Sequence, residues 1–401
     1  MSAKVLVLGG YGTTGTTLSE LLLEYGDAEI VLAGRNRAKG EKAAAALNQR
    51  FPGRVTARVA DAADAASLAR AFDGIDLVAV AASVLAHAGD VAEAALNAGA
   101  DYFDLLLSGA AKFAALERLR PRIEREGRCF ITDGGIHPGL SAAMIRALAP
   151  AFGRLERADV GGLMRVDWNA YAFAIDTIYE FADELKDYRV EALRDGVWTK
   201  LAWRDATRAF DFGAPYGSER CAIMFMEELR RLPEQIPTLR DCAFYVSGFN
   251  RVVDNVLMPL GVGVMKLSPR TLGKPYARLL AGALRRYGRP PYGTVWQVEA
   301  TGEMAGGMTT DADATGAGAA GGAVSAGLRL SHPDGYWLTA AAAAACLLQW
   351  LDGSLREPGV RLQALAVDPA RLLRDLQRMG ARLAGRGVDV GALLGEAPAP
   401  V

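Results

Sequence analysis

Short apolar runs alternate with amphipathic segments through the first third of the chain. Residues 5–8 are all apolar, and the segment after them carries leucines at helical spacing, at 18, 21 and 22. A short run that is apolar at every position is typical of a strand buried on both faces of a parallel sheet. The alternation repeats, with further strands predicted at residues 29–33, 55–59, 76–83, 101–105 and 129–132. It predicts an α/β fold, a doubly wound parallel sheet with right-handed crossovers.

A glycine-rich turn joins the first predicted strand to the first predicted helix. Gly10, Gly12 and Gly15 form the pattern G-x-G-x-x-G within GGYGTTG. In this pattern the first glycine permits the turn, the second lets a pyrophosphate approach the backbone, and the third lets the helix pack closely. Because the pattern follows a strand and opens a helix, it predicts a dinucleotide-binding site. The alternative is an ordinary glycine-rich turn.

The end of the second predicted strand indicates which dinucleotide is bound. An NAD site usually has an acidic residue there that accepts from the ribose 2′-hydroxyl. This chain has Arg35, Asn36 and Arg37 instead. Two guanidinium groups favour a 2′-phosphate, so NADP(H) is predicted over NAD(H). The alternative is that both arginines are solvated in a loop.

Two further strand ends complete the predicted cofactor site. Asp61 follows the third strand, where it either accepts from the adenine amino group or caps the next helix. The small residues after the fourth strand either line the nicotinamide ribose or form a plain turn. The predicted cofactor-binding residues are Gly9, Gly10, Tyr11, Gly12, Thr13, Thr14, Gly15, Arg35, Asn36, Arg37, Asp61, Ala81, Ala82 and Ser83.

The pattern changes after about residue 150. Strands are predicted at 158–166, 197–203, 294–302 and 323–331, and helices at 176–185 and 217–229. The last two strands are expected to pair, and the Gly/Ala/Thr-rich residues 306–322 between them are expected to form a loop that orders over ligand. Predicted helices at 337–351 and 369–379 follow. We therefore predict a Rossmann domain at 1–135, a second α+β domain for substrate and dimerisation at 136–335, and C-terminal helices at 336–401 that pack back on the first domain.

Composition and charge exclude several classes of protein. The chain is 51% hydrophobic and 23% charged, and its formal net charge is -1. This composition is globular, and the charge creates no field for nucleic acid or an anionic membrane. Four widely spaced cysteines and a start that runs straight into a strand predict reduced thiols and a cytoplasmic protein. Residues 338–348 are too short to span a bilayer and residues 252–265 are interrupted by Asp254 and Asn255, so neither segment is a predicted membrane anchor. A lipid-associated protein that uses residues 252–265 as an interfacial patch is a further alternative.

At this point the sequence resembles a known family. The segments GGYGTTG, AGRN, VADAAD, IDLVAVAAS, AALNAGADYFDL and DGGIHPGLSAAMIRAL occur in the order of the saccharopine dehydrogenase (saccharopine reductase-like) family. The resemblance covers about residues 4–148 and returns near the C-terminus in YWLTAAAAAACLLQWLDGSLREPGV. It implies a nicotinamide-dependent oxidoreductase that acts on C–N bonds of amino-acid or polyamine conjugates, built from a Rossmann domain and a second α/β domain.

Candidates for proton transfer are few. No lysine has a tyrosine four residues before it, which excludes the Tyr-x-x-x-Lys pair of short-chain reductases, and the three histidines form no metal-ligand cluster with cysteine. General acid or base catalysis by His137, Tyr102, Asp104 or Asp133 near the cofactor crevice remains. The predicted catalytic residues are His137, Tyr102 and Asp104. Tyr102 and Asp104 stand where the resembling family has a Tyr-x-Asp. Each of the three is open to a structural interpretation as well. Arg165 is a candidate for holding a substrate carboxylate, although solvation at the surface is favoured.

These observations converge on an NADP(H)-dependent oxidoreductase. It would transfer hydride to or from a carbonyl or imine carbon of an amino-acid- or polyamine-like substrate. The expected partners are a small molecule and a second copy of the chain, with no nucleic acid, membrane or metal. The alternative is a non-catalytic NADP(H)-binding sensor or regulatory protein.

Overall fold

The computed structural model describes residues 2–170, 175–305 and 324–395. The predicted ligand-ordered loop at 306–322 lies outside these residues. The chain divides into two compact units, one formed by Met1–Leu140 with Tyr336–Asp368 and the other by Ser141–Gly335 with Pro369–Val401. No helix among the described residues is both long and apolar enough to cross a membrane.

The first unit is built on a parallel sheet of seven strands in the order β15-β6-β5-β4-β1-β2-β3. The chain moves outward from β1 through β2 and β3, then returns to the other side of β1 with β4, so the strand order reverses between β1 and β4. Ligands bind outside the carboxyl ends of the strands at such a reversal. The predicted doubly wound sheet is confirmed. The strands are β1 (Lys4–Leu8), β2 (Glu29–Gly34), β3 (Val55–Val59), β4 (Leu77–Val80), β5 (Asp101–Asp104), β6 (Cys129–Thr132) and β15 (Gly359–Leu362).

Helices connect these strands and bury them. The four residues Val5 to Leu8 are at most 3% exposed, which explains why β1 is apolar throughout rather than alternating. A late segment of the chain joins this unit, because β15 pairs in parallel with β6 and Trp350 Nε1 donates to Asp101 Oδ2 at 2.8 Å. The helices are α1 (Thr13–Tyr25), α2 (Arg37–Arg50), α3 (Ala65–Phe72), α4 (Ala88–Asn97), α5 (Ala110–Arg125), α11 (Gly335–Leu351) and α12 (Gln363–Ala366).

The second unit is built on a mixed sheet of nine strands, with the main order β10-β11-β12-β7-β13-β14-β16. The long strand β7 pairs in parallel with β12 and antiparallel with β13. The predicted pairing of β13 with β14 is confirmed as antiparallel. The strands are β7 (Phe152–Arg165), β8 (Glu191–Arg194), β9 (Val197–Lys200), β10 (Thr207–Asp211), β11 (Ser218–Met224), β12 (Asp241–Ser247), β13 (Gly293–Met304), β14 (Val324–His332) and β16 (Arg382–Arg386).

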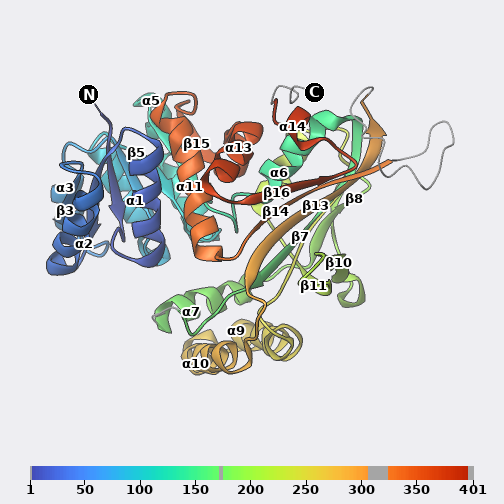
Figure 1. Ribbon diagram of the computed structural model, residues 1–401. Helices are drawn as coiled ribbons and strands as arrows, with labels where there is room; N and C mark the ends of the chain where they lie inside the picture. Colours follow the sequence, from blue (N-terminus) through green and yellow to red (C-terminus); the bar gives the residue numbers. More distant parts are fainter. Residues whose placement is uncertain (1, 171–174, 306–323, 396–401) are drawn as a thin grey trace. The chain divides into compact units, whose positions relative to one another are not determined.

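Helices of the second unit fall into two groups. One group, α6 and α13, packs together, and α6 also contacts β7, β13 and β14. The other group forms a helical lobe, which we define as α7, a π-helical turn at Val253–Leu257, α9 and α10 (Figure 1). The lobe has its own buried core. The helices are α6 (Ser141–Leu148), α7 (Ile175–Asp183), α8 (Glu227–Arg231), α9 (Met258–Leu267), α10 (Pro269–Tyr287), α13 (Pro369–Met379) and α14 (Val390–Leu393).

Two predictions for this unit are wrong. Residues 217–229 do not form one helix, because Ser218–Met224 is strand β11, held between β10 and β12, and α8 begins only at Glu227. The chain after Asp368 does not join the first unit. Strand β16 pairs antiparallel with β14 and α13 packs on α6, so these residues extend the second unit.

Candidate cofactor and active site

The glycine turn after β1 is tightly packed, and the atoms that a Cβ would approach differ from one glycine to the next. Gly9 has φ +87°, and a Cβ there would lie 2.9 Å from the Ala82 Cβ. A Cβ at Gly15 would lie 2.3 Å from the Gly9 carbonyl oxygen. At Gly12 the same test meets only that oxygen, at 3.2 Å, and Gly12 is exposed. The turn therefore closes on itself at Gly15 and stays open to solvent at Gly12.

The start of α1 is suited to bind an anion. Gly12 is the N-cap of this helix of 13 residues and makes no side-chain capping bond, and the first turn holds no acidic residue. The free N–H groups and the positive end of the helix dipole face outward where Gly12 and Thr13 are exposed. The backbone around Gly12 and the start of α1 form a cradle that a side chain at position 12 would fill. Because Gly12 has no side chain, a pyrophosphate can approach the backbone there.

Tyr11 connects the glycine turn to the end of β2. Its hydroxyl oxygen accepts a hydrogen bond from the Asn36 backbone N–H at 2.8 Å. Its ring lies over Gly34, where a Cβ would come within 2.5 Å of the same oxygen. Asn36 in turn caps α2 by accepting from the Lys39 N–H at 3.0 Å. Tyr11 thus holds in place the loop that was predicted to contact the adenosine ribose.

The two arginines of that loop differ in their contacts. Arg37 forms an ion pair with Glu41, with 2.8 Å between Nε and Oε1. Arg35 is exposed and makes no ion pair with any described residue. Arg35 is therefore the better candidate to bind a 2′-phosphate.

The remaining predicted cofactor positions lie at the same edge of the sheet. Strand β4 pairs with β1, with Val80 opposite Leu8. Ala81 comes next, and its backbone N–H donates to the Leu8 carbonyl at 2.8 Å. Ala82 is half-buried and Ser83 is exposed. Asp61 accepts from the Ala63 N–H at 3.1 Å, while Asp64 caps α3. The structure brings the ends of β1 to β4 together, and Asp61 does not cap the following helix.

A buried ionic network lies at the ends of β5 and β6. Lys112, from the first turn of α5, is 2% exposed and donates to Asp104 Oδ1 at 3.1 Å and to Asp133 Oδ1 at 2.7 Å. Thr132 Oγ1 donates to Asp104 at 2.7 Å, and Ser108 Oγ donates to Asp133 at 2.5 Å. Desolvation lowers the pKa of Lys112, but the two carboxylates outweigh it and raise that pKa. Desolvation raises the pKa of Asp133.

This network changes the assignment of two predicted catalytic residues. Asp104 is fully buried, and its carboxylate is occupied by Lys112, Thr132 and the Leu106 N–H. Tyr102 is also fully buried, its ring stacks on Phe130 with centroids 5.2 Å apart, and burial raises its pKa well above 10.0. A substrate cannot reach either side chain through the core around them. Tyr102 and Asp104 therefore have structural roles in the core of the first unit, and their burial contradicts the predicted catalytic roles.

His137 stands on the loop that leaves β6, and it keeps partial contact with solvent. Desolvation lowers its pKa from 6.5 to about 4, so its imidazole is neutral at physiological pH. The loop is anchored by Gln363, whose Nε2 donates to the carbonyls of Gly135 and Gly139, each at 2.9 Å. Of the three predicted catalytic residues, His137 is the one that keeps solvent contact.

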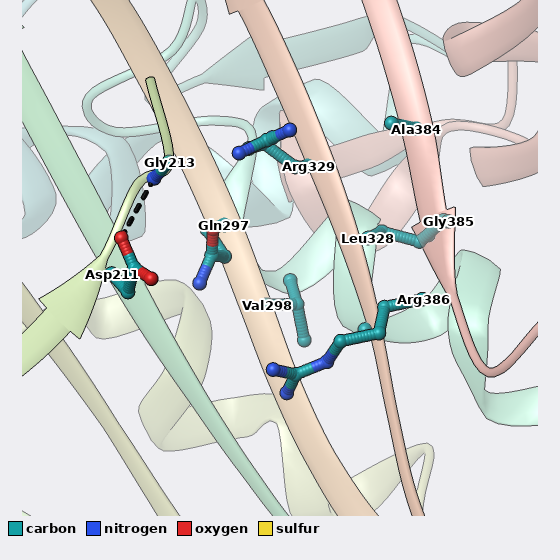
Figure 2. Close-up of a pocket in the computed structure, with 10 residues that line it drawn as sticks. Asp211, Gly213, Gln297, Val298, Leu328, Arg329, Ala384, Gly385 and Arg386 are labelled. Carbon is teal, nitrogen blue, oxygen red and sulfur yellow. Dashed lines mark hydrogen bonds between the residues drawn. The ribbon is translucent and has the colours of Figure 1, made fainter. Parts of the chain in front are cut away.

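A shallow pocket of about 230 Å³ lies on the sheet of the second unit. Figure 2 shows Asp211 beside Gly213 at one side and the guanidinium groups of Arg329 and Arg386 at the other. Arg329 Nη1 donates to the Phe212 carbonyl at 2.7 Å, whereas Arg386 is exposed. The pocket offers charges of both signs to a small ion. The predicted carboxylate ligand Arg165 is instead paired with Glu219.

Sequence reasoning missed three residues that shape this region: Ser108, Lys112 and Gln363. A lysine in an alanine-rich first helical turn gives no local signal of burial, because its partners lie 8 and 21 residues away. Gln363 is separated from Gly135 by 228 residues. Contacts of this range are visible only in the folded chain.

Comparisons with known proteins agree with this geometry. Residues 5–129 match the family described as Saccharopine dehydrogenase NADP binding domain. No curated protein matches. Among solved structures, apo saccharopine dehydrogenase (L-Glu forming) from Saccharomyces cerevisiae aligns with a TM-score of 0.63 and 15% identity, covering 97% of this chain and 100% of that one. A short-chain type dehydrogenase/reductase from Mycobacterium ulcerans aligns with a TM-score of 0.29 and 16% identity, covering 33% and 67% of the two chains.

The family match and the strand order concern the same residues. The matched segment contains the glycine turn, the Arg35 loop and strands β1 to β5, and the cofactor that its description names is the one predicted from the arginines. The fold of the yeast enzyme extends the likeness to both units. Residues 5–129 are therefore similar to the NADP-binding domain of saccharopine dehydrogenases, and the fold of the chain is similar to that of the yeast enzyme.

Proposed function

We propose that this protein is an NADP(H)-dependent oxidoreductase that transfers hydride to or from a carbonyl or imine carbon of an amino-acid- or polyamine-like substrate. The observation that carries the proposal is the open cradle at Gly12, set between the Tyr11–Asn36 hydrogen bond and the exit of β4. The family match of residues 5–129 supports the cofactor, and the likeness in fold to an enzyme named saccharopine dehydrogenase supports a substrate with a C–N bond.

The cofactor supplies or accepts the hydride when it is bound. The residues of the chain must therefore bind the cofactor, orient the substrate and move a proton. Gly12, Thr13 and Thr14 would hold the pyrophosphate at the start of α1, and Arg35 would hold the 2′-phosphate. Neutral His137 would accept a hydrogen bond from the substrate nitrogen and orient it. With a pKa of about 4, His137 rarely carries a proton to donate near pH 7, so a bound water would donate in the direction of reduction.

A second candidate function is a non-catalytic NADP(H) sensor. It is favoured by one observation, the burial of Tyr102 and Asp104 inside the first unit. Because these two side chains are buried, fewer residues remain in the predicted crevice that could transfer a proton to or from a substrate.

A pair of glycine variants tests cofactor binding without confusing it with folding. Gly12→Ala places a methyl group in the cradle but meets only one atom, at 3.2 Å, and its φ of -82° suits alanine. We expect a normally folded protein that has lost NADPH binding. Gly15→Ala is the contrast, because its methyl group would lie 2.3 Å from the Gly9 carbonyl oxygen and should destabilise the fold. If Gly12→Ala binds NADPH as the parent does, the assigned cradle is wrong.

Turnover separates the two functions. NADPH absorbance is followed with a panel of amine and keto-acid pairs, for the parent protein and for His137→Gln. The oxidoreductase predicts turnover with one pair and a lower kcat in the variant at an unchanged Kd for NADPH. Tight NADPH binding without turnover on any pair would favour the sensor.

A further inference from the structure

Exposed apolar side chains are concentrated on the helical lobe of the second unit. Of the eleven large hydrophobic residues that are exposed in the described chain, seven lie between positions 252 and 287. Leu267 is 85% exposed, the largest fraction among them. Soluble proteins scatter such side chains singly, so a group on one lobe indicates an interaction surface. The seven are Val252, Val256, Leu260, Leu267, Leu272, Leu279 and Tyr287.

These side chains form stripes on the outer faces of the helices. Val256 and Leu260 are four residues apart and Leu267 follows seven later, so they share one face across the π-helical turn and α9. On α10, Leu272 and Leu279 are likewise seven residues apart. Each helix therefore has an apolar stripe that its own lobe does not cover.

The inner faces of the same helices are fully packed. Tyr276 of α10 is 4% exposed and its hydroxyl donates to the Leu257 carbonyl at 2.8 Å. Gly261 of α9 permits this approach, because a Cβ there would come within 2.2 Å of the Tyr276 oxygen. The outer leucines are thus not core residues that a small rotation of the helices would bury.

The stripes lie among unpaired cations. Residues 258–289 contain seven lysines and arginines and no acidic residue. All seven are exposed and form no ion pair with any described residue, although Lys266 and Arg289 donate to backbone carbonyls. Asp254 is the one acidic residue between Cys242 and Val298. Acidic residues elsewhere in the chain balance this positive region, so the net charge of -1 for the whole chain does not reveal it.

We propose that the outer face of α9 and α10 binds the surface of an anionic lipid membrane, with the leucines inserted among the headgroups and the cations against the lipid phosphates. Apolar stripes flanked by lysine and arginine are the pattern of helices that lie in a membrane interface. Charge decides against a second copy of the chain as the occupant, because a self-paired face would set seven cations against seven. This inference is independent of the proposed function.

Flotation of the full chain with vesicles tests the proposal. The probes are vesicles of phosphatidylcholine with phosphatidylglycerol and vesicles of phosphatidylcholine alone. We expect binding to the anionic vesicles, weak binding to the neutral ones, and weaker binding as salt is raised. Each cation near an anionic surface strengthens binding about fivefold, so Arg278→Ala with Arg285→Ala should weaken it about 25-fold.

Paired variants distinguish insertion of the lobe's leucines into the membrane from nonspecific binding of exposed apolar side chains to vesicles. Leu267→Glu with Leu279→Glu should abolish flotation, and NADPH binding by the other unit should persist as evidence of a folded protein. The matched control is Val197→Glu with Trp203→Glu, because both side chains are 64% exposed but lie outside the lobe. This control should float like the parent.

Three results would overturn the proposal. They are equal flotation of the parent with neutral and anionic vesicles, unchanged flotation of the Leu267 and Leu279 variant, and a parent dimer that this variant dissociates while no vesicle binds. The last result would assign the face to contact between copies of the chain.

Discussion

The hydroxyl oxygen of Tyr11 accepts a hydrogen bond from the backbone N–H of Asn36, 2.8 Å away. This single contact fixes the loop after β2 against the turn after β1, although the two are 25 residues apart. The proposed pyrophosphate site and the proposed 2′-phosphate site therefore depend on one tyrosine.

Tyr11→Phe tests that dependence. The ring that packs on Gly34 is kept and one hydrogen bond is lost, which is worth about 1 kcal/mol. We expect the Kd for NADPH to rise about fivefold, measured by titration of NADPH fluorescence. Tyr287→Phe, an exposed tyrosine of the second unit, is the control and should bind as the parent does. Equal affinity in Tyr11→Phe would show that the hydrogen bond does not shape the site.

Arg35→Asp should reverse the cofactor preference. The variant removes an unpaired guanidinium and adds a carboxylate that repels a 2′-phosphate and accepts from a 2′-hydroxyl. A charge-assisted contact is worth about 1.5–3 kcal/mol, so NADPH affinity should fall roughly 10- to 100-fold while NADH affinity holds or improves. Arg37→Ala is the matched control and should change little, because Glu41 already pairs with Arg37. An unchanged ratio of the two affinities in Arg35→Asp would refute the assignment.

The first unit was predictable because its signals are local. Each strand of the parallel sheet is an apolar run buried on both faces, and the glycine turn is a pattern of seven contiguous residues. The second sheet was harder because its strands are held by distant partners. Ser218–Met224 carries charged residues that also suit a helix, and only pairing with β10 and β12 makes it a strand.

The catalytic candidates show a different limit. Tyr102 and Asp104 are two residues apart in a strand, so the sequence places them on one face of the sheet. It does not say whether α5 covers that face. Lys112, which occupies Asp104, comes from α5 itself, and a lysine is the last residue that composition would assign to a core.

Lys112→Met should strongly destabilise the first unit. Removing one partner of a buried ion pair leaves the carboxylates of Asp104 and Asp133 uncompensated and typically costs about 3–5 kcal/mol. The free energy of unfolding is measured by urea denaturation. Adding Asp133→Asn should recover part of the loss, and Lys42→Met, on the exposed side of α2, should stay within about 0.5 kcal/mol of the parent. If Lys112→Met lowers the free energy of unfolding by less than about 1 kcal/mol, Lys112 is not needed to stabilise the two buried carboxylates.

His137 should make stability fall in mild acid. Its pKa is lowered to about 4 in the folded protein and is 6.5 when unfolded, so between these values the unfolded chain binds the extra proton. Its contribution is present above pH 6.5 and is lost as pH falls towards 4, by up to about 3 kcal/mol. Subtracting the pH profile of His137→Gln from that of the parent isolates this contribution. A difference that stays flat between pH 7 and 4 would contradict the desolvation of the imidazole.

Asp254 should have the opposite effect. Desolvation raises its pKa from 3.8 to about 6, against the hydrogen bond that it accepts from the Gly248 N–H at 3.2 Å. The folded protein therefore binds the extra proton, so this contribution to stability is present below pH 3.8 and is lost as pH rises through about 6. Asp254→Asn removes the buried charge and should raise the free energy of unfolding at pH 8 by about 3 kcal/mol, with a gain that shrinks steadily towards pH 4. Urea denaturation at the two pH values measures the gain, and the exposed Asp73→Asn, expected within about 0.5 kcal/mol of the parent at both, controls for the lost charge. A variant less stable than the parent at pH 8 would show that the carboxylate is stabilised there by its backbone contacts more than burial penalises it.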